Sequence, residues 1–135
     1  MSKTITDIEG VGVTVQKKLA KAGIRSVGGL LKQGSTKKGR KAIAEASKID
    51  ESKILTFVNM ADLFRIKGIA GQFAELLKAS GVDTVKELRN RNPENLHAKL
   101  LETNSTKKLT RVVPGVKQVT GFVEQAKKLD PMVTH

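Results

Sequence analysis

A short glycine turn near the start of the chain has residue types suited to holding an anion. Residues 8–12 read Ile-Glu-Gly-Val-Gly and precede an amphipathic basic stretch. The first glycine permits a tight reversal, and the second lets backbone amides at a helix start approach an anion with no side chain between them. We expect phosphate contacts from the turn and from the helix that follows it, at Gly10, Val11, Gly12, Val13, Thr14, Lys17, Lys18 and Lys21.

The same turn recurs 58 residues later as Ile-Lys-Gly-Ile-Ala at residues 66–70. At this offset Leu19 matches Leu77, and at a longer offset of 65 Phe57 matches Phe122, so the second copy carries a small insertion. Self-similarity over about sixty residues predicts two copies of a unit built from several helices. We place the copies at residues 1–63 and 64–135, and expect a shared helix at about 51–66 to join them into one rigid unit.

The second turn differs from the first where anion binding would occur. Ala70 replaces the second glycine, and Glu75 lies in the helix that follows, whereas in the first turn Glu9 places a negative charge beside the proposed site. We therefore expect the first turn to bind phosphate better than the second. The candidate contacts of the second turn are Lys67, Gly68, Ile69, Gly71 and Gln72.

The densest basic run, Lys-Lys-Gly-Arg-Lys, spans residues 37–41. It lies at a predicted helix N-terminus, where the helix dipole disfavours cations, so that a bound anion would relieve the cost. A solvated helix face is the alternative, and the run itself does not decide between them. Its candidate contacts are Lys37, Lys38, Arg40 and Lys41.

The charge of the chain favours a polyanionic partner. Its 135 residues include 25 Lys and Arg against 13 Asp and Glu, a net charge of +12 that the two copies share equally. A basic protein of this kind generally binds nucleic acid or an anionic surface through many weak phosphate contacts. The alternative is that the charge serves solubility alone.

Composition also bears on other classes of protein. The chain has no cysteine and two histidines, so we expect no metal centre and no cofactor. No apolar run approaches the roughly 20 residues of a membrane helix. We expect a cytoplasmic protein without membrane association, nucleoid-associated if the source is bacterial or archaeal.

The hydrophobic pattern predicts helices almost throughout and no strand. We expect helices at residues 12–22, from Ser26 onward, at 37–47, at 51–66 and at 116–129. Thr36 is expected to cap the helix at 37–47, and Ala42, Ile43 and Ala46 are expected to form its buried face. The fold class is therefore all-α.

With these elements in place, the turns resemble the hairpins of the helix-hairpin-helix superfamily, in which hydrophobe-Pro-Gly-hydrophobe-Gly precedes a helix. Nearly the whole chain resembles a family of unknown function made of tandem repeats of this kind, through IEGVG, TKKGRKAIAE, VNMADLFRIKGI, GVDTVKELRNRNPENLHAKL and FVEQAKKL. The resemblance implies compact tandem repeats of about eight to nine short helices in all, in SAM-like halves of about five helices packed as one body. By superfamily analogy it implies sequence-independent binding to nucleic-acid backbone.

The chain departs from the superfamily pattern because neither turn contains proline. A third segment, Val-Pro-Gly-Val at residues 113–116, is closer to that pattern. The internal alignment places it opposite the entry to the helix at 51–66, so we expect a helix start there instead.

Catalysis has little support in the sequence. Cysteine nucleophiles are absent, as are the Gly-x-Ser-x-Gly and P-loop patterns. Base-excision enzymes share the hairpin, but they require a pocket that accepts a base. We expect Asp62 to be a surface or capping carboxylate, and we do not expect an enzyme.

The leading hypothesis is a sequence-nonspecific duplex DNA-binding protein, with an architectural role as one option, in which two hairpins hold phosphates. One alternative is a protein–protein interaction module, because a basic helical surface can dock an acidic partner. The other is a protein that binds structured RNA or the ribosome. A monomer is the favoured state.

Overall fold

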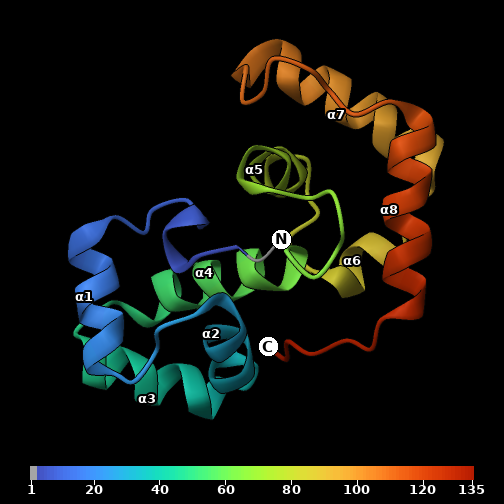
Figure 1. Ribbon diagram of the computed structural model, residues 1–135. Helices are drawn as coiled ribbons and strands as arrows, with labels where there is room; N and C mark the ends of the chain where they lie inside the picture. Colours follow the sequence, from blue (N-terminus) through green and yellow to red (C-terminus); the bar gives the residue numbers. More distant parts are fainter. Residues whose placement is uncertain (1–2) are drawn as a thin grey trace. The chain divides into compact units, whose positions relative to one another are not determined.

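The computed structural model describes residues 3–135, and the regular structure in this range consists of eight α-helices and one 3₁₀ helix (Figure 1). The all-α prediction is confirmed. The chain divides into two compact units, one formed by the described residues up to Asp62 together with Met132–His135, and the other by Leu63–Pro131.

The first unit contains the 3₁₀ helix and four α-helices: η1 Ile5–Asp7, α1 Val13–Lys21, α2 Val27–Gly34, α3 Lys37–Ser47 and α4 Glu51–Leu63, whose last residue is assigned to the second unit. The second unit contains α5 Gly71–Ala79, α6 Val85–Arg89, α7 Pro93–Lys107 and α8 Val116–Lys128.

Side-chain caps fix where several of these helices begin. The Ser26 hydroxyl accepts a hydrogen bond of 3.0 Å from the Gly29 amide at the start of α2, and the Thr36 hydroxyl accepts one of 3.0 Å from Gly39 in α3. In the second unit Thr84 caps α6 in the same way. The predicted helix at 37–47 and its cap at Thr36 are both confirmed.

The two units end corresponding helices with the same kinds of left-handed residue. Gly23 after α1 and Gly81 after α5 have φ angles of +83° and +93°, and each is followed by an amide that bonds back to the helix. At the ends of α3 and α7, Lys48 and Lys108 are left-handed, with φ angles of 63° and 50°. Left-handed residues of this kind terminate helices by satisfying their last carbonyl groups. The helix α7 has 15 residues against 11 in α3, which accounts for part of the insertion in the second copy.

The structure corrects the predicted inner face of α3. Ile43 is buried as expected, but Ala42 and Ala46 are exposed, and Arg40 and Ser47 are buried instead. The prediction assumed that the apolar residues would define the face. The buried face instead contains a charged side chain that finds hydrogen-bond acceptors inside the unit.

The helix α4 is shorter than the predicted range of 51–66, and it is more deeply buried than its apolar stripe indicates. It ends at Leu63, and the Ile66 amide donates to the Leu63 carbonyl at 3.1 Å in a tighter turn. Every residue from Phe57 to Phe64 is buried, including Asp62, which is 1% exposed. The expectation of a surface carboxylate at Asp62 was therefore wrong, because this end of α4 is covered on all sides rather than along one stripe.

Candidate functional site

The first glycine turn leads directly into α1. Gly10 has a φ angle of +90°, and the Val11 amide donates to the Ile8 carbonyl at 3.0 Å, which closes a four-residue turn. Gly12 then adopts an extended conformation, and α1 begins at Val13 with no side chain capping its first amides. Because the first amides of an α-helix have no partner within the helix, this start can donate to an anion.

The second turn has the same backbone. Gly68 has a φ angle of +97°, and the Ile69 amide donates to the Ile66 carbonyl at 3.2 Å. Ala70 is extended, with a φ angle of −114°, and α5 begins after it without a side-chain cap. Only the middle glycine of each turn therefore needs a left-handed conformation. Alanine fits at the last position because extended backbone suits any residue.

An aromatic ring packs against the middle glycine in both units. A Cβ atom on Gly10 would lie 3.2 Å from Cε1 of Phe57 in α4. A Cβ atom on Gly68 would lie 3.0 Å from Cε1 of Phe122 in α8. In each unit a phenylalanine of the last helix thus packs against the turn. This shared contact explains why Phe57 and Phe122 correspond in the internal alignment.

The hydrophobic residue between the turn glycines is not a phosphate contact. Val11 is 5% exposed and Ile69 is 0% exposed, so both side chains lie in the core. Their amides are used in the hydrogen bonds that close the turns. The prediction that Val11 and Ile69 contact phosphate is therefore corrected, since neither their side chains nor their amides are available.

The other candidate residues of the first turn are accessible. They form what we call the first-turn surface: Gly10, Gly12, Val13, Thr14, Lys17, Lys18 and Lys21, all of them exposed. Lys17 and Lys21 are one helical turn apart, so their side chains leave the same side of α1. None of the ion pairs found among the described residues involves a lysine of this surface.

In the second unit the turn is fastened to α8. The Lys67 amide donates to Oε1 of Gln125 at 2.9 Å, and Nε2 of Gln125 donates to the Lys67 carbonyl at 3.0 Å. The corresponding residue in the first unit is Met60, which is buried and has no side-chain amide to bind the turn backbone. Gly71 is half-buried, whereas Lys67, Gly68 and Gln72 are exposed. Sequence reasoning missed Gln125, since nothing near it in the chain indicates a contact 58 residues away.

The basic run divides between the surface and the interior. Lys37, Lys38 and Lys41 are exposed, whereas Arg40 is 3% exposed. Arg40 donates from Nη1 to the Gly34 carbonyl at 2.8 Å and from Nη2 to the Thr134 carbonyl at 2.6 Å. The prediction of a phosphate contact at Arg40 is therefore corrected, because its guanidinium is already engaged.

Burial lowers the pKa of the Arg40 guanidinium, and the Glu51 carboxylate opposes this shift. Arginine nonetheless stays protonated in proteins, so Arg40 is a buried cation. Its second partner comes from the C-terminal residues, where the Thr134 amide also donates to the Ser35 carbonyl at 2.8 Å and Val133 is 6% exposed. The arginine therefore joins α2, α3 and the last residues of the chain within the first unit.

We expect Arg40→Met to lower the stability of the first unit by about 2 kcal/mol, because two hydrogen bonds from a charged donor are lost while the aliphatic volume is kept. Urea unfolding followed by circular dichroism measures the change. Lys41→Met removes the same charge from an exposed neighbour and is expected to change stability by less than about 0.5 kcal/mol. Equal effects of the two substitutions would contradict the role assigned to Arg40.

The proline-containing segment at 113–116 is a helix start, as predicted. Gly115 precedes α8 with a φ angle of −68°, whereas the middle glycines of both turns have positive φ. Gly115 therefore lacks the left-handed conformation of the middle glycine in the two turns.

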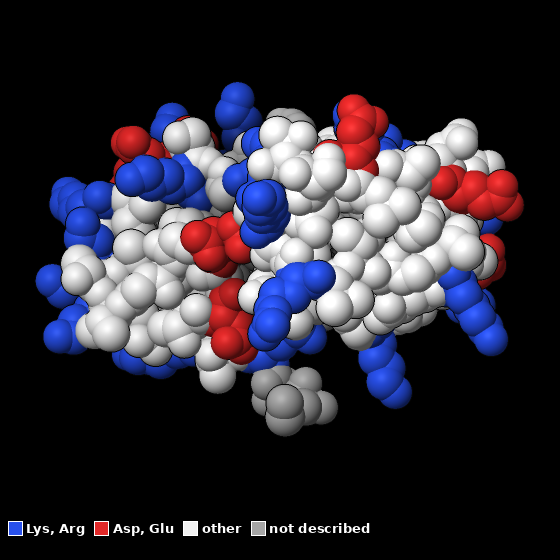
Figure 2. Space-filling view, turned by 90° about the horizontal axis from the view of Figure 1, so that it is seen from above, with Lys and Arg blue, Asp and Glu red and all other residues white. Residues whose placement is uncertain are grey.

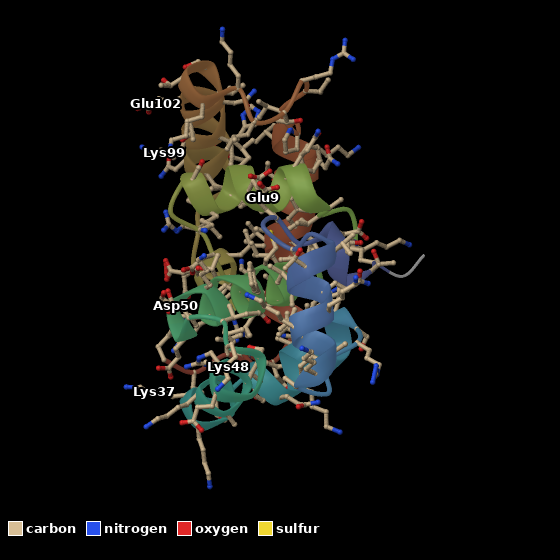
Figure 3. The ribbon with its side chains drawn as sticks, turned by 90° about the vertical axis from the view of Figure 1, so that its left-hand side faces the viewer. Glu9, Lys37, Lys48, Asp50, Lys99 and Glu102 are labelled. Atoms are coloured by element: carbon tan, nitrogen blue, oxygen red, sulfur yellow. The ribbon has the colours of Figure 1, made fainter. Side chains whose placement is uncertain are left out.

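Basic side chains project into solvent one by one on the face seen in Figure 2, with carboxylates among them. Lys37 is the first residue of α3 and Lys48 directly follows its last. Both are labelled in Figure 3, which also shows Lys99 next to Glu102 on α7. The Lys99–Glu102 pair, 4.0 Å apart, is exposed and contributes little to stability. The positive charge is thus spread over many separate side chains, which suits several weak phosphate contacts.

Within residues 3–135, no group of three His, Cys, Asp or Glu side chains is placed to hold a metal ion. No helix in that range is long and apolar enough to cross a membrane. Comparisons with curated proteins and with solved structures found no match. A family model described as a domain of unknown function (DUF4332) matches residues 9–129. Its match includes all eight α-helices and both glycine turns except for Ile8, and the chain belongs to this family.

Proposed function

We propose that the protein binds the phosphate backbone of duplex DNA without sequence preference, and that the first-turn surface is its main contact. The observation that carries this proposal is the uncapped start of α1 after an exposed Gly12, with Lys17, Lys18 and Lys21 on the helix that follows. The resemblance to helix-hairpin-helix proteins supports the same assignment.

In this proposal the backbone supplies the first contact. The amides of Val13 and Thr14 donate to phosphate oxygens, and the positive end of the α1 dipole favours the negative charge. The Thr14 hydroxyl adds a donor, and Lys17 and Lys21 reach neighbouring phosphates. The exposed lysines of α3 extend the contact along the backbone. Phosphate contacts of this kind fix position and carry no base information, so binding is expected to be nonspecific.

The second turn is proposed as the weaker contact. Its turn backbone at Lys67 is held by Gln125, and Ala70 brings a methyl group where the first turn has only hydrogen. The exposed residues Lys67, Gly68 and Gln72 remain its candidate contacts.

Salt dependence tests the proposed partner. If about 5 phosphates are neutralised, the logarithm of affinity for duplex DNA is expected to fall with the logarithm of salt concentration at a slope of roughly −4.5. Fluorescence anisotropy with a labelled duplex at several salt concentrations measures this slope. A flat salt dependence, or no binding at low salt, would reject duplex DNA as the partner.

The substitution Gly12→Glu tests the proposed site. A Cβ atom at Gly12 has no heavy atom within 4 Å and the backbone is extended, so the fold accommodates the side chain while its carboxylate repels phosphate. We expect at least about tenfold weaker duplex binding, which corresponds to about 1.4 kcal/mol. The matched control is Gly115→Glu, which places the same charge before α8, also with open space around the Cβ. Equal losses for both variants would point to net charge alone and reject the first turn as the contact.

Two further measurements separate the alternatives. Competition between duplex DNA and duplex RNA of the same sequence tests whether the surface reads B-form geometry, because the two helices differ in groove shape. Retention of an acidic protein with no nucleic acid in the same preparation would favour the interaction module instead.

A further inference from the structure

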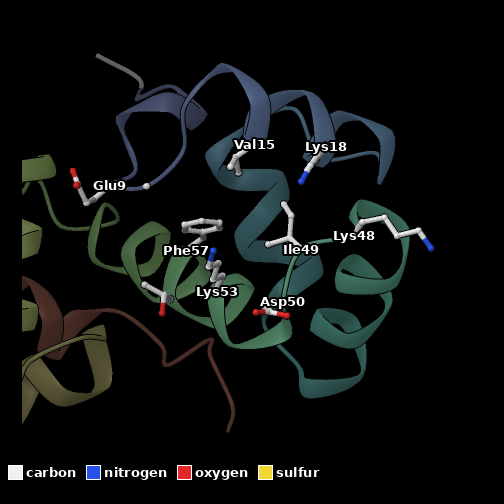
Figure 4. Close-up of a pocket in the computed structure, with 10 residues that line it drawn as sticks. Glu9, Val15, Lys18, Lys48, Ile49, Asp50, Lys53 and Phe57 are labelled. Carbon is white, nitrogen blue, oxygen red and sulfur yellow. The ribbon is translucent and has the colours of Figure 1, made fainter.

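The first unit contains a groove next to the proposed phosphate site. It lies between α1, the junction of α3 and α4, and α4 itself, and has a volume of about 460 Å³ (Figure 4). Val15, Ile49 and Phe57 give it an apolar floor. Its size lies within the range of about 300–1,000 Å³ that is usual for small-molecule sites.

Charged side chains of both signs surround this floor. The cations are Lys18, Lys48 and Lys53, and the carboxylates are Glu9 and Asp50. In Figure 4, Lys18 descends from α1 on the same side as Val15, and Lys53 stands beside Phe57 on α4. Ion pairs among the described residues include none of these five groups. The groove therefore offers both positive and negative groups that are free to interact with a ligand.

The internal duplication shows that this groove is not a necessary feature of the fold. The counterpart of Val15 is Phe73, whose ring centroid lies 6.4 Å from that of Phe122, at an interplanar angle of 56°. The counterpart of Lys18 is Leu76, which is fully buried. The second unit thus puts large apolar side chains where the first has a valine and a lysine.

The charged residues at the groove also differ between the two units. Lys53 corresponds to Gln118 at the offset of 65, so this cation, like Lys18, is absent from the matching position of the second unit. The charged groups therefore differ in kind between the copies, because Lys18 and Lys53 have uncharged counterparts in the second unit, whereas Glu9 corresponds to Lys67 and Lys48 to the left-handed Lys108. Packing alone would favour the filled version, because an unfilled depression forfeits apolar contacts.

The chemistry of the residues that line the groove limits the classes of ligand that fit it. A simple anion such as inorganic phosphate would gain nothing from the apolar floor and would be repelled by the two carboxylates. A nucleotide uses all three features, because its phosphate pairs with lysines, its base packs on apolar side chains, and its amino or hydroxyl groups donate to carboxylates.

We propose that the groove binds a single nucleotide unit carrying a terminal phosphate, either the 5′ end of a nucleic-acid strand or a free nucleoside monophosphate. This inference rests on the proposed function, since the groove shares Lys18 with the first-turn surface and would receive a strand end next to a duplex held by α1. It adds recognition of DNA ends to binding along the duplex.

The experiment compares four probes in anisotropy titrations: a duplex closed by hairpin loops at both ends, an open duplex with 5′-phosphorylated single-nucleotide overhangs, the same duplex with 5′-hydroxyl ends, and free AMP as competitor. The expected result is at least about fivefold tighter binding of the phosphorylated ends than of the hydroxyl ends. Competition by AMP would extend the assignment to free nucleotides, and lack of competition would restrict it to strand ends. Equal binding of the phosphorylated and hydroxyl ends together with no competition by AMP would overturn the proposal.

Variants copied from the second unit locate the effect. Val15→Phe is expected to fill the groove and abolish the end preference while leaving binding to the closed duplex intact. Lys53→Gln is expected to weaken the end preference by removing a cation without adding bulk to the groove, and Lys32→Gln, which alters an exposed lysine on α2, is the matched control. If both groove variants keep the end preference, the site that recognises strand ends lies outside the groove, and the proposal is overturned. If the unaltered protein does not bind the closed duplex at all, the proposed function is rejected instead.

Discussion

Replacing Gly39 by alanine is expected to destabilise the first unit by about 3–4 kcal/mol, although the same change in an ordinary helix stabilises it by about 1 kcal/mol. A Cβ atom on Gly39 would overlap the Gln33 carbonyl oxygen, and it would lie 3.1 Å from the Gln33 carbonyl carbon. The obstacle is backbone rather than the end of a flexible side chain. The junction of α2 and α3 would therefore have to move as a whole.

Urea unfolding followed by circular dichroism at 222 nm measures the expected loss for Gly39→Ala. Gly28→Ala is the control, because Gly28 lies in α2 with no heavy atom within 4 Å of an added Cβ. That variant is expected to gain up to about 1 kcal/mol from its helix propensity. A neutral or stabilised Gly39→Ala protein would show that α3 does not pack this closely against the end of α2.

This close approach explains why a glycine interrupts the basic run. It brings the first turn of α3 against Gln33, and the Gly39 amide still donates to its Thr36 cap. With that turn fixed, Arg40 faces inward toward the Gly34 carbonyl, and the lysines on either side of it face solvent. The spacing of charges in the run is thus set by packing as much as by any ligand.

The local features of this fold were predictable from the sequence because they depend on residues close together in the chain. Thr36 and Ser26 cap helices through amides three residues away, and such caps have clear sequence signals. The repetition of both turns was visible for the same reason. The burial of Arg40 was not predictable, because its Thr134 partner lies 94 residues away and a charged residue in a basic run gives no sign of an interior acceptor.

The candidate site was predictable in its glycines and less so in its other residues. The glycine pattern of residues 8–12 marks the turn as a whole, so the prediction included Val11 although that residue's amide closes the turn. The alignment of Val15 with Phe73 was available from the sequence, but its meaning depended on the contact of Phe73 with Phe122. Tertiary contacts of this kind decide whether a position is filled or open, and periodicity does not report them.

The second large effect is expected at the turn glycines. Gly10→Ala should destabilise the first unit by about 3 kcal/mol, because alanine at a φ of +90° is strained by about 1–2 kcal/mol and its Cβ also presses on the Phe57 ring at 3.2 Å. Gly68→Ala should have a similar effect on the second unit, where the Phe122 ring is 3.0 Å away. Gly12→Ala is the control and should cost less than about 1 kcal/mol, since Gly12 is extended with open space around it.

A double substitution separates the two contributions at Gly10. Combined with Phe57→Leu, Gly10→Ala should lose its steric part, because a shorter side chain no longer meets the new methyl group, and should keep the backbone strain of about 1–2 kcal/mol. The stabilities of the two single variants, the double variant and the unaltered protein, each from urea unfolding, give the coupling between the two residues. A coupling of zero would mean that the ring does not limit the turn, and that the glycine is required for its left-handed backbone alone. A coupling of about 1 kcal/mol or more would show that α4 and the turn are packed as one element, so that the core of the unit supports the phosphate site proposed at the start of α1.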